Sequence, residues 1–222
     1  GSVRTSGPNS MVFADDVVVT ANTSFDTTNN GGLASGANIT FGKTLNGSAN
    51  NGQSVTLNAG TAGVVSVAGS IGNANTLSTL TLTQSNGATF SGPVATGTSV
   101  VLTSTADGQV IRFAGNLTTP ILTTTNRAYA LEILGTTTTI TNATNFLNTG
   151  ALTLGDAVGD TLNFTGGLTA TSASVVNMAG TFNTTNSAIV LGSGTTPVQL
   201  TANVKMGTGT GHVTFGGLLN GN

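Results

Sequence analysis

The chain has 222 residues, of which 5% are charged and 37% are hydrophobic, and its net charge is −2. An average globular domain has about 25% charged residues. This balance argues against a nucleic-acid partner, because such a protein needs a basic surface to neutralise phosphates. The hydrophobic residues are mostly Val, Leu and Ile in alternating patterns, so the chain can bury a core and is not a disordered low-complexity segment.

Few residues bear on localisation. Residues 1–2 are Gly-Ser, which is typical of the scar left after tag removal, and we assign residues 3–222 to a single segment. No apolar run approaches the roughly 20 residues of a membrane-spanning helix, so no membrane insertion is expected. The chain has no Cys, which fits a protein exported without disulfides and equally fits many cytosolic proteins.

Strand signals begin near the start of the chain and continue to its end. The segment SVTLNAG (54–60) alternates Val and Leu with Thr and Asn, and TLTLT (79–83) alternates Leu with Thr. A period of two residues is typical of a strand with one buried and one exposed face. Gly-containing pairs such as Asn-Gly separate these segments, because Gly and Asn tolerate positive φ. Since helical periodicity is almost absent, the sequence predicts an all-β protein.

A corner motif recurs along the chain: a large apolar residue, a short segment that usually contains Gly, and an apolar residue four positions after the first. Its copies begin, in chain order, at Phe41, Val67, Phe90, Phe113, Phe164, Met178 and Phe215. The first four copies follow one another at steps of about 23–26 residues, which is a spacing typical of repeat architectures. The gap from Phe113 to Phe164 amounts to two more such steps. The step from Phe164 to Met178 is much shorter and does not fit this period.

A helix-free period of 20–30 residues favours a β-solenoid, in which stacked coils bury a continuous apolar column. A Gly is expected at each corner, because a Cβ there would strain the backbone or collide with the neighbouring coil. The prediction is a parallel β-helix with about 23 residues per coil and a length of roughly 45 Å. An antiparallel β-sandwich is the alternative, since Asn-Gly pairs are also typical of hairpins.

The segment ANITFGKTLNGS (37–48) has a close counterpart at the end of the chain, GHVTFGGLLNGN (211–222). The offset from Phe41 to Phe215 suggests a longer period nested over the coils, so that residues 3–222 hold one long repeat unit and the start of the next. Gly217 stands where the first copy has Lys43. We therefore expect the side chain at this corner position to point outward.

Three segments, 17–47, 53–83 and 148–171, resemble the repeats of very large bacterial exoproteins of the filamentous-haemagglutinin type and related giant adhesins. The resemblance covers most of the chain and implies a right-handed parallel β-helix. It further implies export to the cell surface and a role in attachment or as a stalk. The expected partners are neighbouring repeats of the same chain and surface glycans or proteins of another cell. The family supplies no catalytic residues to this sequence, and TNRAYALEILG (125–135) departs from its pattern.

An enzyme needs titratable groups brought together. Here the acids are scattered, and most lie beside Gly or Asn: Asp15, Asp16, Asp26, Asp107, Glu132, Asp156 and Asp160. We interpret Asp107 and Asp156 as residues that cap turns. No catalytic residue and no cofactor is expected, and a polysaccharide-degrading solenoid enzyme is the least favoured alternative.

Two places are candidates for binding. GDAVGDT (155–161) is like one degenerate copy of a calcium-binding repeat, which makes Asp156 and Asp160 candidate metal ligands, although one copy cannot complete an oxygen shell. His212 is the only His, which excludes a multi-His metal site. Arg127 and Tyr129 share one face of a predicted strand and form a candidate spot for a glycan or a protein. Alternatively, Tyr129 covers an edge of the core.

The Thr-rich segments 79–83, 122–126 and 136–141 suggest outer ladders of the kind that solenoid ice-binding proteins use. Coils of unequal length argue against the regular grid that ice binding needs. A glycan- or ice-binding module is the alternative to the structural role. The function predicted from the sequence is that of a structural stalk or adhesive segment of a large secreted or cell-surface bacterial adhesin, supporting attachment or cell–cell cohesion.

Overall fold

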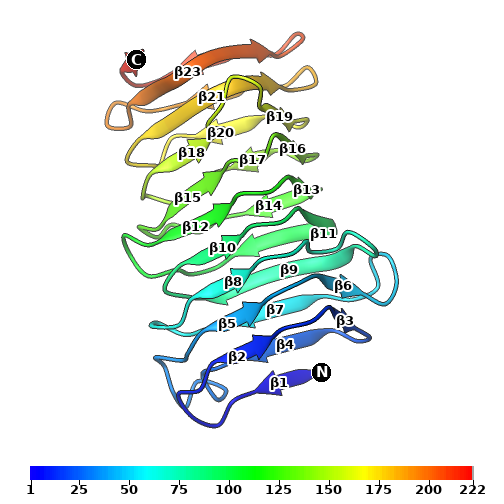
Figure 1. The fold of residues 1–222 in the computed structure, drawn as a ribbon. Coiled ribbons are helices and arrows are strands. Elements are labelled where there is room, and N and C mark those ends of the chain that lie inside the picture. The colour runs from blue at the N-terminus through cyan, green and yellow to red at the C-terminus, as the bar shows by residue number, and fades with distance from the viewer. Residues whose placement is uncertain (222) are drawn as a thin grey trace.

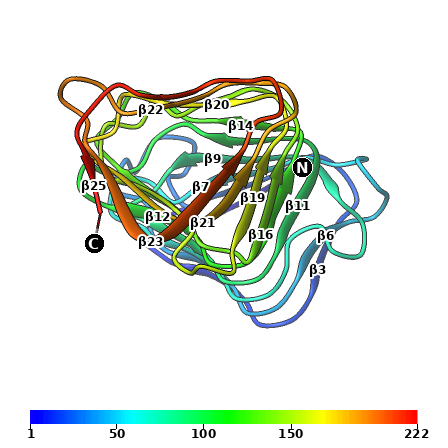
Figure 2. The same ribbon diagram turned by 90° about the horizontal axis from the view of Figure 1, so that it is seen from above.

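The computed structural model describes residues 1–221, which form 25 strands. The strands stack as coils of one solenoid, with the two termini at opposite ends (Figure 1). Seen along the axis, each coil has three sides, which we name face 1, face 2 and face 3 in the order of the chain (Figure 2). The chain turns anticlockwise as it rises toward a viewer at the C-terminal end, so the helix is right-handed (Figure 2). No helix in the described residues is long and apolar enough to cross a membrane.

Each face is a stack of parallel strands. Face 1 contains β2 (Met11–Phe13), β5 (Ile39–Phe41), β8 (Val65–Val67), β10 (Ala88–Phe90), β12 (Val110–Phe113), β15 (Ala130–Ile133), β18 (Leu152–Leu154), the first parts of β21 (Val176–Asn183) and β23 (Val198–Gly207), and β25 (Leu219–Asn220). Face 2 contains β3 (Val17–Val19), β6 (Leu45–Gly47), the bridge residue Ile71, the first part of β11 (Val94–Leu102), β13 (Leu117–Thr119), β16 (Thr137–Ile140), β19 (Thr161–Phe164) and the second parts of β21 and β23. Face 3 contains β1 (Ser2–Arg4), β4 (Thr23–Asp26), β7 (Val55–Asn58), β9 (Leu77–Gln84), the second part of β11, β14 (Ile121–Thr123), β17 (Thr144–Asn145), β20 (Leu168–Ala170), β22 (Ile189–Leu191) and β24 (Val213–Phe215). We number the coils by their face 1 strand, from coil 1 at β2 to coil 10 at β25.

The strand pairing confirms the predicted parallel solenoid. Every pairing between named strands is parallel. Within residues 1–221 the one antiparallel contact is an isolated bridge between Ser193 and Thr196. The register on face 1 makes the longest coil run from Met11 to its partner Ile39, and the shortest from Val110 to its partner Ala130. The alternative of an antiparallel sandwich is therefore wrong.

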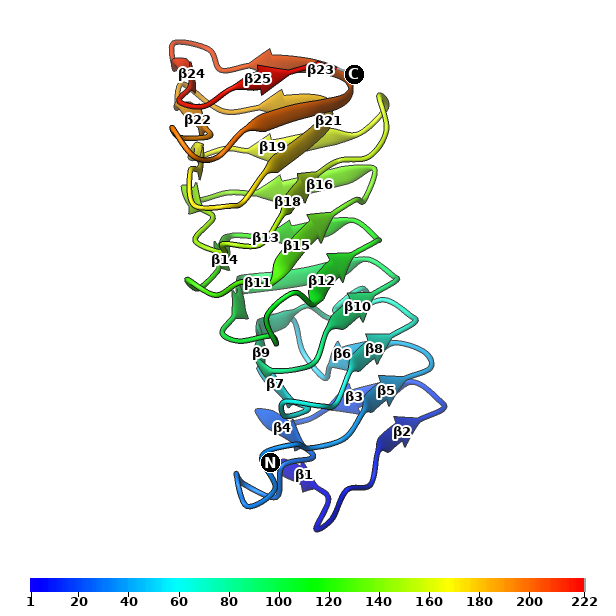
Figure 3. The ribbon, with the colours of Figure 1, turned by 90° about the vertical axis from the view of Figure 1, so that its left-hand side faces the viewer.

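The core is a set of apolar columns that run the length of the solenoid. The strands of face 1 stack one above another along the axis (Figure 3), so the Cα partners of successive coils form one column. It consists of Phe13, Phe41, Val67, Phe90, Phe113, Ile133, Leu154, Met178 and Leu200. Five members of the corner series, Phe41, Val67, Phe90, Phe113 and Met178, lie in this column. The predicted stacking of coils through these residues is therefore confirmed.

The other two copies of the corner motif lie on other faces. Phe164 lies in β19 on face 2, where it pairs with Ile140, and Phe215 lies in β24 on face 3, where it pairs with Leu191. The short step after Phe164 is therefore the path from face 2 of coil 7 to Met178 on face 1 of coil 8. The motif encodes a strand, a corner and a strand, and the chain uses it at different corners. Phe41 and Phe215 thus occupy different places in their coils, and the long nested repeat stays a prediction.

The corner glycines bring successive coils into close contact. An added Cβ at Gly92 would lie 2.5 Å from the backbone of Gly69, and one at Gly115 would lie 2.4 Å from the backbone of Gly92. Gly135 continues the column, with its Cβ position 2.5 Å from the carbonyl oxygen of Gly115. The reason for Gly at these corners is therefore the lack of space between coils, as predicted.

Candidate functional site

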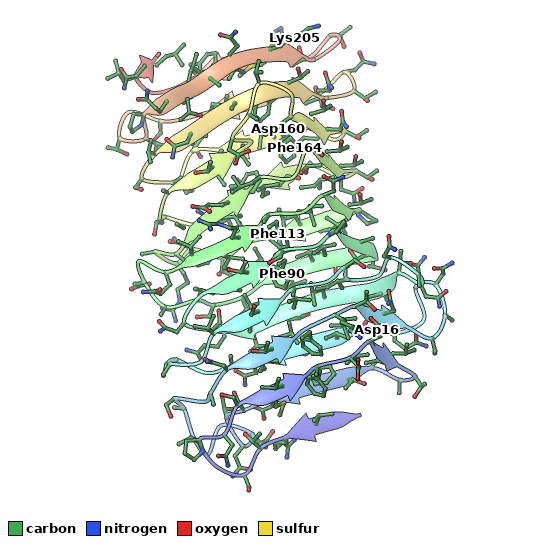
Figure 4. The ribbon with its side chains drawn as sticks, viewed as in Figure 1. Asp16, Phe90, Phe113, Asp160, Phe164 and Lys205 are labelled. Atoms are coloured by element: carbon green, nitrogen blue, oxygen red, sulfur yellow. The ribbon has the colours of Figure 1, made fainter. Side chains whose placement is uncertain are left out.

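Asp160, and not Asp156, caps the turn between β18 and β19. The Asp160 side chain is 2% exposed, and its Oδ2 accepts the backbone N–H groups of Asp156 and Ala157, both at 2.9 Å (Figure 4). The Asp156 residue is exposed. Partial burial of its carboxyl group and the negative charge of Asp160 raise the pKa of Asp156. The prediction placed the cap at the wrong one of the two acids; Asp107, the other predicted cap, lies exposed in a turn.

Asp156 and Asp160 remain the candidate metal ligands. Within residues 1–221, no three His, Cys, Asp or Glu side chains are arranged to hold a metal ion together. One oxygen of Asp160 is already used by two backbone N–H groups. His212 is exposed beside β24. Side chains at this turn therefore offer Ca²⁺ two carboxyl groups, and most of its usual six to eight oxygens would have to come from backbone carbonyls and water.

The structure does not place Tyr129 at the surface, where the predicted spot formed by Arg127 and Tyr129 requires it. Tyr129 is 0% exposed, its Oη accepts the N–H of Thr125 at 3.2 Å, and burial raises its pKa. Arg127 is exposed in a bend before β15, outside the strand. Tyr129 does share a side with Leu131, as strand alternation predicts, but that side faces the core. The structure therefore supports the alternative in which the tyrosine belongs to the core.

The outer surface of face 1 carries one column of side chains that crosses all the coils. From coil 1 to coil 10 it consists of Val12, Thr40, Ser66, Thr89, Arg112, Glu132, Thr153, Asn177, Gln199 and Asn220. Arg112 and Glu132 form an ion pair between coils 5 and 6. Asn177 Nδ2 donates to Thr153 Oγ1 at 3.3 Å between coils 7 and 8. Polar contacts between neighbouring coils thus continue on the outer side of the ladder.

Face 2 carries a small regular array of hydroxyl and amide groups over coils 6–8, which we name the Thr/Asn array. One column is Thr137, Thr161 and Thr181, and the second is Thr139, Asn163 and Asn183. Asn183 Nδ2 donates to Asn163 Oδ1 at 3.0 Å. The number of residues from Thr137 to Thr161 differs from the number from Thr161 to Thr181, yet the strands stay in register. Over these three coils the unequal lengths do not shift the strand register, because the corners absorb the difference in length.

Charged side chains join the first two coils. Lys43 Nζ lies 2.7 Å from Asp15 Oδ1, and both side chains are exposed, so the predicted outward direction of Lys43 is confirmed. Asp16 Oδ1 accepts the hydroxyl of Thr44 at 2.6 Å and its N–H at 3.0 Å. These two hydrogen bonds lower the pKa of Asp16.

The surface of the described residues includes a larger and a smaller hollow. The larger, of about 510 Å³, is at the C-terminal end and is lined by Leu200, Thr201, Ala202, Asn203, Val204 and Gly221. The smaller, of about 260 Å³, lies over residues 143–145, 166–169 and 188. Among residues 1–221, neither lining contains a titratable side chain. The hollows therefore offer no acid or base to a bound molecule.

Comparison with known proteins found no match, either to protein-family models or to curated proteins or solved structures. A function for the chain must therefore be inferred from its own residues.

Asp26 is the acid whose surroundings the sequence did not predict. It is 5% exposed, and its Oδ1 accepts the N–H of Thr28 at 2.8 Å and the Thr28 hydroxyl at 2.6 Å. Its Oδ2 accepts the N–H of Asn30 at 2.7 Å and lies 3.5 Å from Arg4 Nε. Burial alone would raise the pKa of Asp26, but these hydrogen bonds and the Arg4 charge together lower it. The text DTTNN (26–30), an acid before a polar turn, is the signal that points to this cap.

Proposed function

We propose that the chain is a structural segment of a large secreted or cell-surface bacterial adhesin. It acts as a stalk and presents its own faces for cohesion. The observation that carries this proposal is the unbroken parallel ladder of face 1, from β2 to β25. At roughly 4.8 Å per coil, the ladder makes a rod of about 45 Å. A rod in which every coil bonds to the next holds its two ends apart.

The surface supports the same role. The outward side chains of face 1 are mostly Thr, Ser, Asn and Gln, and their charged members pair with each other as Arg112 and Glu132. Neighbouring coils lie under about 5 Å apart, where like charges directly above one another are destabilising. Because only 5% of the residues are charged, few such pairs arise along the rod. The segments that resemble filamentous-haemagglutinin repeats add the expectation of export. The proposed partners are neighbouring repeats and the glycans or proteins of another cell surface.

Surface location is tested with antibodies raised against the purified chain. They should label intact, unpermeabilised cells of the bacterium that produces it, and protease treatment of intact cells should remove the label. Labelling that appears only after lysis would contradict the proposal.

Cohesion is tested with beads that carry the chain at a defined density. If the faces are adhesive, coated beads aggregate with each other or with cells; if the chain is only a spacer, they stay dispersed while the rod length from small-angle scattering remains about 45 Å. Hydrolysis of a polysaccharide that is lost in Asp107→Asn or Asp156→Asn would replace the structural role by the enzymatic alternative.

A second candidate function is binding of ordered water at an ice surface, and the Thr/Asn array is the observation that favours it. Its two columns place hydroxyl and amide groups at the strand spacing of a sheet, about 4.8 Å along the axis. For a glycan the array lacks an aromatic platform, since Tyr129 and Phe164 are both buried. Thermal hysteresis that is lost in Thr161→Lys and kept in Thr153→Lys, on face 1, would establish this function. Equal freezing behaviour of the chain and of an unrelated protein would exclude it.

A further inference from the structure

Face 3 has a break in its backbone ladder between coils 5 and 6. The strands from β1 to the second part of β11 and β14 pair in order, and β17, β20, β22 and β24 form a separate sheet of four strands. β14 and β17 are neighbours along the axis, but no backbone pairing joins them (Figure 1). In contrast, faces 1 and 2 are continuous between the same coils, through β12 and β15 and through β13 and β16. We name the boundary between β14 and β17 the seam.

One side chain takes the place of the missing backbone bonds. Thr124 is 2% exposed, and its Oγ1 accepts the N–H of Leu147 at 2.8 Å. The same hydroxyl donates to the carbonyl oxygen of Asn145 at 3.3 Å. Backbone bonds between these coils resume at the two corners that flank the seam, from Asn142 N–H to Pro120 O and from Thr149 N–H to Arg127 O. On face 3 itself, both hydrogen bonds that cross the seam are thus made by the Thr124 hydroxyl group.

The seam is also bordered by a polar group without a partner. Asn148 is 0% exposed, and its Oδ1 accepts no hydrogen bond. Its Nδ2 has only long contacts, of 3.4–3.5 Å, to the carbonyl oxygens of Tyr129, Gly150 and Ala151. A buried polar atom without a partner costs about 1–3 kcal/mol, so the native packing beside the seam is less favourable than a fully bonded coil.

The rest of the stack shows that a short strand does not by itself make a break. On face 2, coil 3 contributes only the bridge residue Ile71 between β6 and β11. Even so, backbone bonds cross it on both sides: Ile71 donates to Pro93, and Gly72 and Ala95 donate to Leu45 and Ile71. Among the coils formed by residues 1–221, the seam is the one boundary where a face has strands but no backbone pairing.

In a stack where each coil contacts only its neighbours, stability is close to a sum of interface terms, and the weakest interface opens first. We infer that, among the boundaries between inner coils, the solenoid opens first at the seam: face 3 separates between β14 and β17 while faces 1 and 2 stay paired and act as the hinge. Opening uncovers the facing edges of β14 and β17, whose N–H and C=O groups are not paired with each other, and these groups can then pair with another strand. This inference does not depend on the proposed function.

Native-state hydrogen exchange of the whole chain tests the inference, because neighbouring amides report on different boundaries. Asn142, Leu147 and Thr149 donate across the boundary between coils 5 and 6. Thr144 and Phe146, in the same segment, donate to Gly167 and Thr169 of coil 7. We expect the first three amides to exchange together, at least about tenfold faster than the other two after correction for intrinsic rates.

A matched pair of substitutions provides the control. Thr124→Val keeps the shape but removes both hydrogen bonds, and it should speed exchange at all three boundary amides by about tenfold, the equivalent of about 1.4 kcal/mol. Thr138→Val, also buried and one coil away, removes a hydroxyl without a partner and should leave them unchanged. Exchange of Asn142 and Thr149 as slow as that of Thr144 and Phe146 in the wild type would overturn the inference, since only Leu147 would then fray locally. That comparison holds even if Thr124→Val does not fold.

Discussion

Phe90 and Phe113 stack face to face inside the solenoid, with their ring centroids 4.9 Å apart and an angle of 17° between the ring planes. They are Cα partners on β10 and β12, and both are almost fully buried (Figure 4). Phe13 and Phe41 repeat the arrangement near the N-terminus, at 4.8 Å. Phenylalanines that lie one coil apart in the sequence are thus in direct ring contact in the structure.

The Phe113→Ala variant should therefore lose much of the stability of the fold. Removing a fully buried Phe costs about 3–5 kcal/mol through lost burial and the cavity that remains. Urea unfolding followed by circular dichroism should show a clearly lower midpoint. Phe215→Ala is the control, because Phe215 is 38% exposed and its loss should cost less than about 1 kcal/mol. Equal midpoints for the two variants would contradict the column of stacked rings.

Gly115→Ala should destabilise the chain although alanine is small. The new Cβ would lie 2.4 Å from the backbone of Gly92, so two coils must move apart, at a cost of about 1–3 kcal/mol or more. Gly159→Ala provides the comparison, since its Cβ would meet no atom within 4 Å. Thermal melting of both variants separates the two effects. A Gly115→Ala protein as stable as Gly159→Ala would show that the coils are not in close contact at this corner.

The sequence predicts the coil and its core well, because period-two alternation and the corner motif are local features. It does not predict which corner a motif occupies. Phe113 and Phe164 begin nearly the same text, FAGNL and FTGGL, yet one lies on face 1 and the other on face 2. The face on which a copy of the motif lies depends on the number of residues in the preceding corners. A local sequence pattern does not contain that number.

The candidate site was less predictable for a related reason. Alternation placed Tyr129 on the same side as Leu131, but it does not say which side faces the core. Arg127 precedes the strand, so alternation does not apply to it. The choice between Asp156 and Asp160 depended on which carboxylate the turn folds over, and both follow a Gly in the sequence.

Thr138→Val should stabilise the chain. Thr138 is 0% exposed, lies in the face 2 column between Leu117 and Leu162, and its Oγ1 has no hydrogen-bond partner. Replacing the hydroxyl by a methyl group removes the cost of burying an unsatisfied polar atom, so a gain of about 1 kcal/mol is expected. The measurement is the unfolding midpoint in urea. Thr139→Val, on the outward side of the same strand, should change it by less than about 0.5 kcal/mol; a loss in Thr138→Val would mean that the hydroxyl is bonded in solution.

Asp26 should make the stability of the chain depend on acidity. Its pKa is lowered from 3.8 in the folded state, so its contribution is complete above pH 3.8 and is lost as the pH falls through the lower folded value. Asp26→Asn should cost about 1–3 kcal/mol at pH 7, because the amide keeps one acceptor oxygen and turns its NH2 group toward the N–H of either Thr28 or Asn30.

The measurement is the difference in unfolding free energy between the wild type and Asp26→Asn at several pH values. The difference should be constant from pH 7 to about pH 5 and should shrink toward pH 2. Asp107→Asn, at an exposed turn, should cost less than about 0.5 kcal/mol at pH 7. A difference that stays constant down to pH 2 would show that the Asp26 carboxylate does not favour the folded state.

The coils differ in length, from the long step between Met11 and Ile39 to the short one between Val110 and Ala130, but their strands keep one register. The longest coil carries its extra residues in the segment 27–38, between β4 and β5, outside the stacked columns. The corner that leads from face 3 to face 1 is therefore a place where evolution can lengthen or replace the chain without disturbing the rod, whereas the glycine corner between faces 1 and 2 has no room for added atoms. For the same reason a foreign loop, such as an epitope or a binding peptide, can be grafted between β4 and β5. The stacked strands must therefore keep their residues and register, whereas the connecting segments outside the columns are free to vary in sequence and length.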